Sequence, residues 1–576
     1  MQPVDFTTLM AVAQDLRRHW VPSRCEQVVQ WDTTSLALAL RSLNQQAWLT
    51  LSWHPQAARL HLGDKPPRGQ DTFTFSRQLK HQLNQLALVA IHPVAAWERV
   101  LDLQFGPRPG DLPQWHLYVE IMGKYSNVIL VNAQNQIVTA AHQVSEQQSR
   151  VRPIQTGDIY RVPPALGGGL PSRQESQQAW QDRLTLIPNR LSQMLMQSYA
   201  GLSSALVRSL LAKAELETDP FPDHLHQTDW DRLFQVWQSW LLTLETGNFH
   251  PALTANGYTV LAWDQPTGAT IHQVLNQYYR DQLNRQQFNQ LKNQLQQKLK
   301  VSLAKLQQKI GLFDQRLEES TQADRYRHQA DLLMAYGHQW QPGLTQMILG
   351  DFITGEGVTI AIDPDKTAIQ QAQRLYKQHQ KLKRARTAIA PLLAEVKAEL
   401  AYLEEVEAAL NQLTNYTEPA DLEILIDIRN ELIQQNYLTA PDYRSGDQRA
   451  SKTGGFRQCL SPDGLIVLIG RNNRQNDQLV SSVASDYDLW FHSQEIPGSH
   501  VLLRVDPGQV ASDRDRQYAA DLAAYFSQAR QADQVPVVYT QPRHLYKPRG
   551  ARPGMVVYKQ ETVIWGQPRR VEPKFS

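Results

Sequence analysis

The chain has 576 residues, of which 41% are hydrophobic and 20% charged, and its formal net charge at pH 7 is +2. This length is enough for three or four domains, and this hydrophobic content is enough for real cores. The nearly balanced charge excludes an overall field that would draw the protein onto nucleic acid or a membrane, so any basic binding site must be local.

The cysteines and the apolar stretches indicate the cellular compartment of the protein. The two cysteines, Cys25 and Cys459, lie far apart and outside any CxxC spacing. They indicate a reducing compartment and argue against a thiolate zinc site. The first residues lack a basic segment followed by an apolar one, so we expect no signal peptide. The most apolar stretch, near residues 86–97, is too short to span a bilayer. We therefore predict a cytoplasmic protein without a membrane partner.

Residues 1–172 are predicted to form an α/β domain with a mostly antiparallel sheet. Helices are expected at residues 6–18 and 75–86, and strands at residues 35–43, 47–53, 58–62, 100–105, 115–121 and 128–131. Leu117, Val119 and Ile121 alternate with polar residues, which is typical of a strand with one buried face. Residues 250–272 return to strand and turn character, and we predict that they complete this sheet.

Residues 173–249 are predicted to be helical, after a glycine-rich and proline-rich boundary. Gly201 to Leu206 lie between two amphipathic helices. The pattern resembles a helix-hairpin-helix, in which the amides of the turn can hold a phosphate at a helix N-terminus. A glycine turn between two packed helices fits these residues equally well.

Residues 273–440 are predicted to form a long antiparallel coiled coil. Apolar residues recur at steps of three and four, the seam of a helix that pairs with another helix. The first run is Phe288, Leu291, Leu295, Leu299, Leu303, Leu306, Ile310, Phe313 and Leu317, and the second is Leu382, Ile389, Leu392, Val396, Leu400, Leu403, Leu410 and Leu413. A small knob with strand character at residues 345–363 joins the two helices, which would reach about 65 Å. A buried bundle is the alternative, but the narrow seam favours an arm.

The second helix of this arm changes sign along its length. Lys381, Lys383, Arg384 and Arg386 have no acidic residue among them, whereas glutamates follow from Glu395 onwards. This asymmetry predicts that the basic stretch contacts phosphate and that the acidic stretch contacts protein or solvent. A plain solvated helix surface is the alternative.

After a polar linker at residues 441–455, residues 456–576 are predicted to form a compact α/β module that binds RNA. Backbone amides and side-chain donors gather near residues 470–477, where a helix is expected to begin, and this suits phosphate. Residues 540–559 are basic with interleaved tyrosines, which is typical of RNA binding. The predicted RNA-binding residues are Arg471, Asn472, Asn473, Gln475, Asn476, Trp490, His492, His500, Arg543, Lys547, Arg549 and Arg552.

Alternatives remain for several of these residues. Trp490 and its neighbour Phe491 are slightly better explained as core residues. The basic stretch could instead be a solvated edge strand. A metal on His492 and His500 is not expected, because two histidines without a thiol or carboxylate partner are a poor metal site.

Motifs for catalysis are missing from the sequence. It contains no Walker loop, GxSxG, HExxH or dinucleotide-binding glycine pattern, so an NTPase or hydrolase is disfavoured and we expect no cofactor. Glu98 and Arg99 are adjacent and could orient a ligand as a paired acceptor and donor. A surface ion pair is the default explanation of such neighbours.

Several long motifs resemble the NFACT family. They are residues 118–127 (YVEIMGKYSN), 488–492 (DLWFH), 497–500 (PGSH) and 547–551 (KPRGA), and the resemblance extends nearly end to end. It implies a multidomain α+β protein with an N-terminal α/β domain, a helical domain, a long coiled coil and a C-terminal RNA-binding module. The N-terminal fold of this family is similar to that of formamidopyrimidine-type DNA glycosylases. That activity requires a terminal proline amine, whereas Pro3 here follows Gln2, so we reject it.

The resemblance also implies a function. Bacterial NFACT proteins bind obstructed large (50S) ribosomal subunits that carry peptidyl-tRNA, and they recruit alanyl-tRNA. They direct C-terminal alanine tailing of the stalled chain for degradation, and a small RNA-binding helper protein is the expected additional partner. The family's Asp-Arg pair for tRNA aligns with Glu98 and Arg99, so the acid has one more methylene here. The alternatives are a ribosome- and tRNA-binding factor without tailing, a surface adhesin that binds fibronectin, and a nucleic-acid enzyme.

Overall fold

A computed structural model describes residues 1–67, 69, 71–164, 167–216, 218–263, 268–439 and 455–571. The predicted linker at residues 441–455 lies outside the described residues except for Gly455. The described chain divides into two compact units, residues 1–283 and residues 284–439 with 455–571. Helix α7 (Ile271–Thr321) contributes residues to both.

The first unit contains a nine-stranded antiparallel sheet in the order β4-β3-β2-β1-β5-β6-β7-β8-β9. Its strands are β1 (Ser23–Gln30), β2 (Ser35–Arg41), β3 (Gln46–Ser52), β4 (Arg59–Gly63), β5 (Ala87–Pro93), β6 (Val100–Gly106), β7 (Trp115–Glu120), β8 (Asn127–Asn132) and β9 (Ile137–Ala140). The predicted antiparallel strands are confirmed, and Leu117, Val119 and Ile121 are buried as expected. Strands β1, β5 and β9 were not predicted. In β1 the burial pattern is irregular around a shift in register between Cys25 and Gln27.

Helices cover this sheet and share its core. They are α1 (Phe6–Trp20), α2 (Thr74–Leu83), α3 (Gln177–Leu184), α4 (Leu191–Ser198), α5 (Ser204–Lys213) and α6 (Gln227–Thr246). Tryptophans of α3 and α6 belong to the same buried cluster as residues of the strands. Helix α1 begins where Asp5 accepts a hydrogen bond from the Thr8 amide, 2.8 Å away, which satisfies an otherwise free helix donor.

The prediction that residues 250–272 complete the sheet is wrong. Strands β10 (Ala252–Thr254) and β11 (Gly257–Thr259) form a separate two-stranded hairpin. Tyr258, Val260 and Leu261 nevertheless join the core of the first unit. Each strand is only three residues long, so its apolar side chains are buried by packing rather than by pairing with the large sheet.

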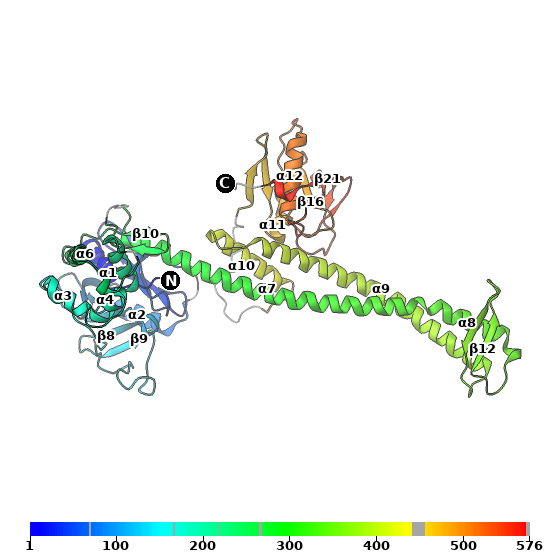
Figure 1. Ribbon diagram of the computed structural model, residues 1–576, viewed down its shortest axis with the longest axis horizontal. Helices are drawn as coiled ribbons and strands as arrows, with labels where there is room; N and C mark the ends of the chain where they lie inside the picture. Colours follow the sequence, from blue (N-terminus) through cyan, green and yellow to red (C-terminus); the bar gives the residue numbers. More distant parts are fainter. Residues whose placement is uncertain are drawn as a thin grey trace. The chain divides into compact units, whose positions relative to one another are not determined.

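The second unit begins with two long helices that run in opposite directions (Figure 1). They are α7 and α9 (Ala368–Gln412), and α8 (Ala323–Ala335) continues from α7. Contacts between them pair Lys292 with Thr414, Asp314 with Lys397, and Ala323 with His379. In these pairs the residue number rises along α7 and α8 as it falls along α9, so the helices are antiparallel. Strands β12 (Gln346–Gly350) and β13 (Gly357–Ala361) form the predicted knob.

The apolar seam differs from its prediction at one place. Leu392 is exposed and Leu393 is buried, so the seam steps by four residues from Ile389 to Leu393 and by three to Val396. A strict sequence spacing leaves both choices open, because each uses steps of three and four.

The C-terminal module consists of a six-stranded antiparallel sheet in the order β14-β15-β17-β16-β18-β21. Its elements are β14 (Arg457–Leu460), β15 (Ile466–Ile469), α11 (Asn473–Gln478), β16 (Leu489–Ser493), β17 (Val501–Leu503), α12 (Asp513–Tyr525), β18 (Val535–Thr540) and β21 (Thr562–Gly566), with β19 (Leu545–Tyr546) and β20 (Val557–Tyr558) as a separate pair. One buried cluster joins alanines of α12 to Phe491 and Val537. Another contains Trp490 and Val538, which gives this sheet two apolar faces.

Candidate RNA interface

The basic stretch of α9 is fully presented to solvent. Lys381, Lys383, Arg384 and Arg386 are all exposed. Within the described residues, no carboxylate lies within 4 Å of their charged groups. A helix face with unpaired cations at this density attracts phosphate through its local field.

The polar stretch at the start of α11 is inside the protein. Arg471, Asn472, Asn473, Gln475 and Asn476 are each at most 6% exposed. Asn472 caps the helix by accepting a hydrogen bond from the Gln475 amide at 2.9 Å, and the Gln475 side chain accepts one from the Arg471 amide at 2.9 Å. The side chains that were predicted to contact RNA are therefore buried within the chain.

These side chains bind the helix that follows the arm, α10 (Pro419–Gln434). Arg471 forms an ion pair with the buried Asp421. The Asn473 amide donates to Glu431 at 3.1 Å, and the Tyr402 hydroxyl donates to the same carboxylate at 2.8 Å. The stretch thus attaches the C-terminal module to α9 and α10. A guanidinium or amide group can donate hydrogen bonds to a carboxylate or to a phosphate, and the local sequence looks the same in both cases.

Sequence reasoning did not single out the acidic partners on α10. A signal was nevertheless present, because Asp427 and Glu431 are spaced i, i+4 on the helix beside buried Ile424 and Ile428. Acids on the apolar face of a helix are rarely buried without a partner, so they predict a basic or amide surface opposite.

Trp490 and His500 are also interior residues, with 1% and 2% exposure. The Trp490 ring stacks on His492 with centroids 5.8 Å apart. Burial lowers the pKa of His492 to about 4 and that of His500 well below its usual value. The explanation of Trp490 as a core residue is therefore the one that the structure supports. Both histidines are neutral at pH 7, so neither supplies positive charge to a phosphate there.

The basic loop after β18 combines exposed and anchored residues. Arg543, Lys547 and Arg549 are exposed. Lys547 pairs with Asp477, and the Gly554 amide donates to the same carboxylate at 3.0 Å. Arg552 is partly buried over the rings of tyrosines in and after the arm, 5.0 Å from Tyr402 and 5.6 Å from Tyr437. Arg552 thus anchors the loop, and Arg549 is left at its exposed tip.

Glu405 of α9 also contacts the module, and it predicts a pH dependence. Its carboxyl accepts a hydrogen bond from the Gly498 amide at 2.9 Å and lies 3.9 Å from His492. Burial raises the pKa of Glu405 to about 8, and the charge of Glu404 adds to the rise. A carboxyl whose pKa is raised by folding contributes stability below its unfolded pKa, about 4.3, and loses it as the pH rises through 8.

We therefore expect the melting temperature of the wild-type protein to fall between pH 6 and 9 by more than that of Glu405→Gln. The amide of glutamine keeps an acceptor for Gly498 but does not ionise. Thermal denaturation at each pH measures the difference. Glu395→Gln, at an exposed position on the same helix, is the control and should follow the wild type. Parallel pH profiles for wild type and Glu405→Gln would contradict this assignment.

In the first unit, Glu98 and Arg99 lie at the start of β6. Glu98 is 6% exposed, so its side chain is buried rather than on the surface. Arg99 is partly exposed, and its carbonyl accepts a hydrogen bond from the Ile121 amide at 2.9 Å. The pair is thus built into the edge of two neighbouring strands, with only the arginine reaching solvent.

The turn that resembles a helix-hairpin-helix lies between α4 and α5. Ser203 caps α5 by accepting a hydrogen bond from the Leu206 amide at 3.0 Å. Its hydroxyl donates to the Asp5 carboxylate at 2.6 Å. A carboxylate at this helix N-terminus takes the place that a phosphate would need, so the geometry favours a packing turn.

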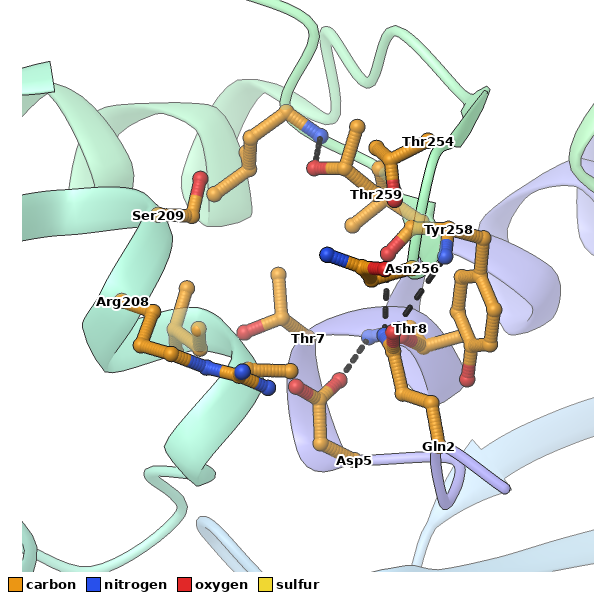
Figure 2. A pocket seen from close by; sticks show the side chains of 14 residues that line it. Gln2, Asp5, Thr7, Thr8, Arg208, Ser209, Thr254, Asn256, Tyr258 and Thr259 are labelled. Atoms are coloured by element: carbon orange, nitrogen blue, oxygen red, sulfur yellow. Dashed lines mark hydrogen bonds between the residues drawn. The ribbon is translucent and has the colours of Figure 1, made fainter. Parts of the chain in front are cut away.

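A pocket of about 320 Å³ opens beside this turn, between the starts of α1 and α5 and the β10–β11 hairpin (Figure 2). Figure 2 shows Asp5, Thr7 and Thr8 on one side, with Arg208 and Ser209 of α5 facing them. The Gln2 side chain accepts a hydrogen bond from the Tyr258 amide at 3.2 Å.

Two properties of the described residues bear on the site. No helix there has the length and apolar character needed to cross a membrane. No group of three or more His, Cys, Asp or Glu side chains in that part of the chain is arranged to hold a metal ion.

Comparison with known families decides the relationship. A family model described as NFACT N-terminal and middle domains matches residues 5–451, and one described as NFACT protein RNA binding domain matches residues 455–560. The chain belongs to the NFACT family. The C-terminal module of this NFACT protein is accordingly an RNA-binding domain, and the loop around Arg549 is one of the places where it exposes cations.

Individual relatives agree with this assignment. The chain is 30% identical over 571 residues to "Rqc2 homolog RqcH" of Streptococcus pneumoniae, covering 96% of each chain. It is 26% identical over 546 residues to the protein of the same name from Bacillus subtilis, covering 92% of this chain and 91% of that one.

Two solved structures from Streptococcus suis are also similar to this NFACT protein. The C-terminal part of a fibronectin/fibrinogen-binding protein is 31% identical, with a TM-score of 0.37, and covers 49% of this chain and 95% of that one. The N-terminal part is 24% identical, with a TM-score of 0.39, and covers 48% of this chain and 99% of that one.

Proposed function

We propose that this protein is a ribosome quality control factor that binds obstructed large (50S) ribosomal subunits carrying peptidyl-tRNA. The observation that carries the proposal is the exposed stretch Lys381 to Arg386 on α9, whose cations have no carboxylate within 4 Å in the described part of the chain. A long helix with such a stretch, joined to an RNA-binding domain, suits a partner whose surface is rich in RNA backbone phosphates. The name of the relatives, Rqc2 homolog RqcH, supports the same role.

The proposal extends to the reaction that the protein serves. It recruits alanyl-tRNA and directs alanine tailing without mRNA, so that the stalled chain is degraded. The ribosome performs peptide transfer, and this protein positions tRNA rather than acting as an enzyme or using a cofactor. It works in the cytoplasm, with a small RNA-binding helper protein. Arg99, which reaches solvent, is the candidate tRNA contact, and the buried Glu98 holds its place.

A pulldown of the tagged protein from its own cells, with sedimentation and sequencing of the bound RNA, tests the proposal. Large-subunit RNA with enriched alanine tRNA is the expected result, and it would show that Glu98 suffices. Large-subunit RNA without tRNA preference would leave a ribosome-binding factor without tailing. Recovery of neither RNA would reject the proposal, and protease shaving of intact cells would then test the adhesin alternative.

A single exposed arginine in the loop provides a narrower prediction. Arg549→Glu is expected to lower affinity for large-subunit RNA about 3- to 10-fold at 0.1 M salt and to reduce the salt slope by about 1. Its stability should stay within about 0.5 kcal/mol of the wild type, because the side chain is exposed. Filter binding across a salt series measures both quantities. Arg514→Glu on α12 reverses another exposed charge in the module, and equal losses in both variants would argue against a specific loop contact.

A further inference from the structure

Trp97 has an unusual backbone conformation for its size. Among the described residues, eight non-glycine residues have positive φ, and Trp97, with φ of 63°, is the only aromatic one. The left-handed region is strained for a bulky side chain and persists only where the surroundings enforce it. Such strain in a fold points to a local geometric requirement.

Two helices enforce this conformation through the indole ring. The ring centroid of Trp97 lies 4.7 Å from that of Phe6 on α1 and 5.6 Å from that of Trp240 on α6. Trp240 is itself fixed, because its indole N–H donates to the Thr7 hydroxyl at 3.0 Å. The ring of Trp97 is therefore held between aromatic neighbours whose own positions are set by the core.

The turn between α4 and α5 closes a third side of the ring. Gly201 has φ of 80°, and a Cβ atom added there would lie 2.6 Å from Cε3 of Trp97. Glycine is thus needed at this position for its conformation and also for the space beside the indole. The segment that resembles a helix-hairpin-helix contacts the residue that precedes Glu98 and Arg99.

We infer that Trp97 is a positioning residue for the tRNA contact of Arg99, and that Gly201 lets the turn after α4 hold it. This inference rests on the proposed function, because the tRNA contact is part of that function. The indole fixes the chain one residue before Glu98, and the hydrogen bond from the Ile121 amide fixes it again at Arg99. The turn between α4 and α5, which holds the indole, therefore helps to set the direction of the Arg99 side chain.

The full-length variant Gly201→Ala tests this inference by two measurements. Hydrogen exchange should become at least 10-fold faster at residues 94–101, and affinity for alanyl-tRNA should fall about 10-fold, close to the loss in Arg99→Ala. Adding Arg99→Ala to Gly201→Ala should cause little further loss, because both changes remove one interaction. Gly247→Ala is the matched control: its φ is 70°, but the three atoms nearest to its Cβ would belong to the flexible Gln14 side chain.

The outcomes are distinct. Unchanged exchange at residues 94–101 in Gly201→Ala, or additive losses with Arg99→Ala, would overturn the inference. If Gly201→Ala does not fold, Trp97→Leu removes the indole ring instead. This variant should show the same faster hydrogen exchange at residues 94–101 and the same loss of affinity for alanyl-tRNA. Wild-type protein that sediments with large subunits but binds no tRNA would overturn the inference together with the tRNA part of the proposal, whereas loss of sedimentation itself would reject the proposed function.

Discussion

Replacing Arg471 by methionine is expected to detach the C-terminal module from the arm and to lower the free energy of unfolding at that junction by about 3 kcal/mol. Arg471 is 6% exposed and pairs with Asp421, which is 5% exposed. Removing one partner of a buried ion pair leaves an uncompensated charge and costs about 3–5 kcal/mol. The Thr417 hydroxyl and the Glu418 amide still donate to Asp421, at 2.6 and 3.2 Å, so the loss falls at the lower end.

Hydrogen exchange of α10 and α11 is the appropriate measurement, because a chain with several domains need not unfold in one step. Arg514→Met is the matched control in the same module. Arg514 is 77% exposed and lies 3.7 Å from Asp463, and such surface pairs contribute about 0–1 kcal/mol. Similar exchange in the two variants would show that the junction does not depend on the buried pair. In the double variant Arg471→Met, Asp421→Asn, part of the loss should be recovered, because no unpaired carboxylate remains.

Much of the fold follows from local patterns in the sequence. The apolar steps of three and four predict the long helices, and the break between them predicts the knob, because helix periodicity is local. Strands β1 and β5 were missed for different reasons. The first has an irregular burial pattern around a register shift at Cys25. The second is almost continuously apolar, and such a run does not by itself distinguish a strand from a helix.

The interaction partners of polar side chains are harder to predict than the helices and strands to which these side chains belong. Arg471 and its partner Asp421 are 50 residues apart, and Asn473 and Glu431 are 42 apart. Nothing in the local sequence around α11 indicates whether its donors will meet a phosphate or a carboxylate. By contrast, the exposure of Arg549 follows from its loop, since Pro548 and Gly550 beside it disfavour regular structure. The exposure of a polar side chain was therefore easier to predict on loops and helix faces than near buried junctions.

Binding to the large subunit is expected to depend most strongly on the basic face of α9. A variant with Lys381, Lys383, Arg384 and Arg386 all changed to glutamate should bind at least about 100-fold more weakly at 0.1 M salt. Each phosphate contact contributes about 0.9 to the slope of log affinity against log salt, so losing four contacts removes several units of that slope. The side chains are exposed, so the helix itself should fold normally.

The same helical arm supplies a control that is matched in charge. Lys298, Lys300, Lys305 and Lys309 on α7 are exposed, and changing them to glutamate alters the net charge by the same amount. Co-sedimentation with large subunits across a salt series distinguishes the two variants. If binding is a general effect of charge, both lose affinity equally. If α9 contacts phosphate directly, only its variant loses both affinity and salt slope, while circular dichroism remains that of the wild type. The exposed location of the α9 cations, away from any carboxylate in the described residues, favours the second result, because their interaction with phosphate does not require breaking an existing ion pair.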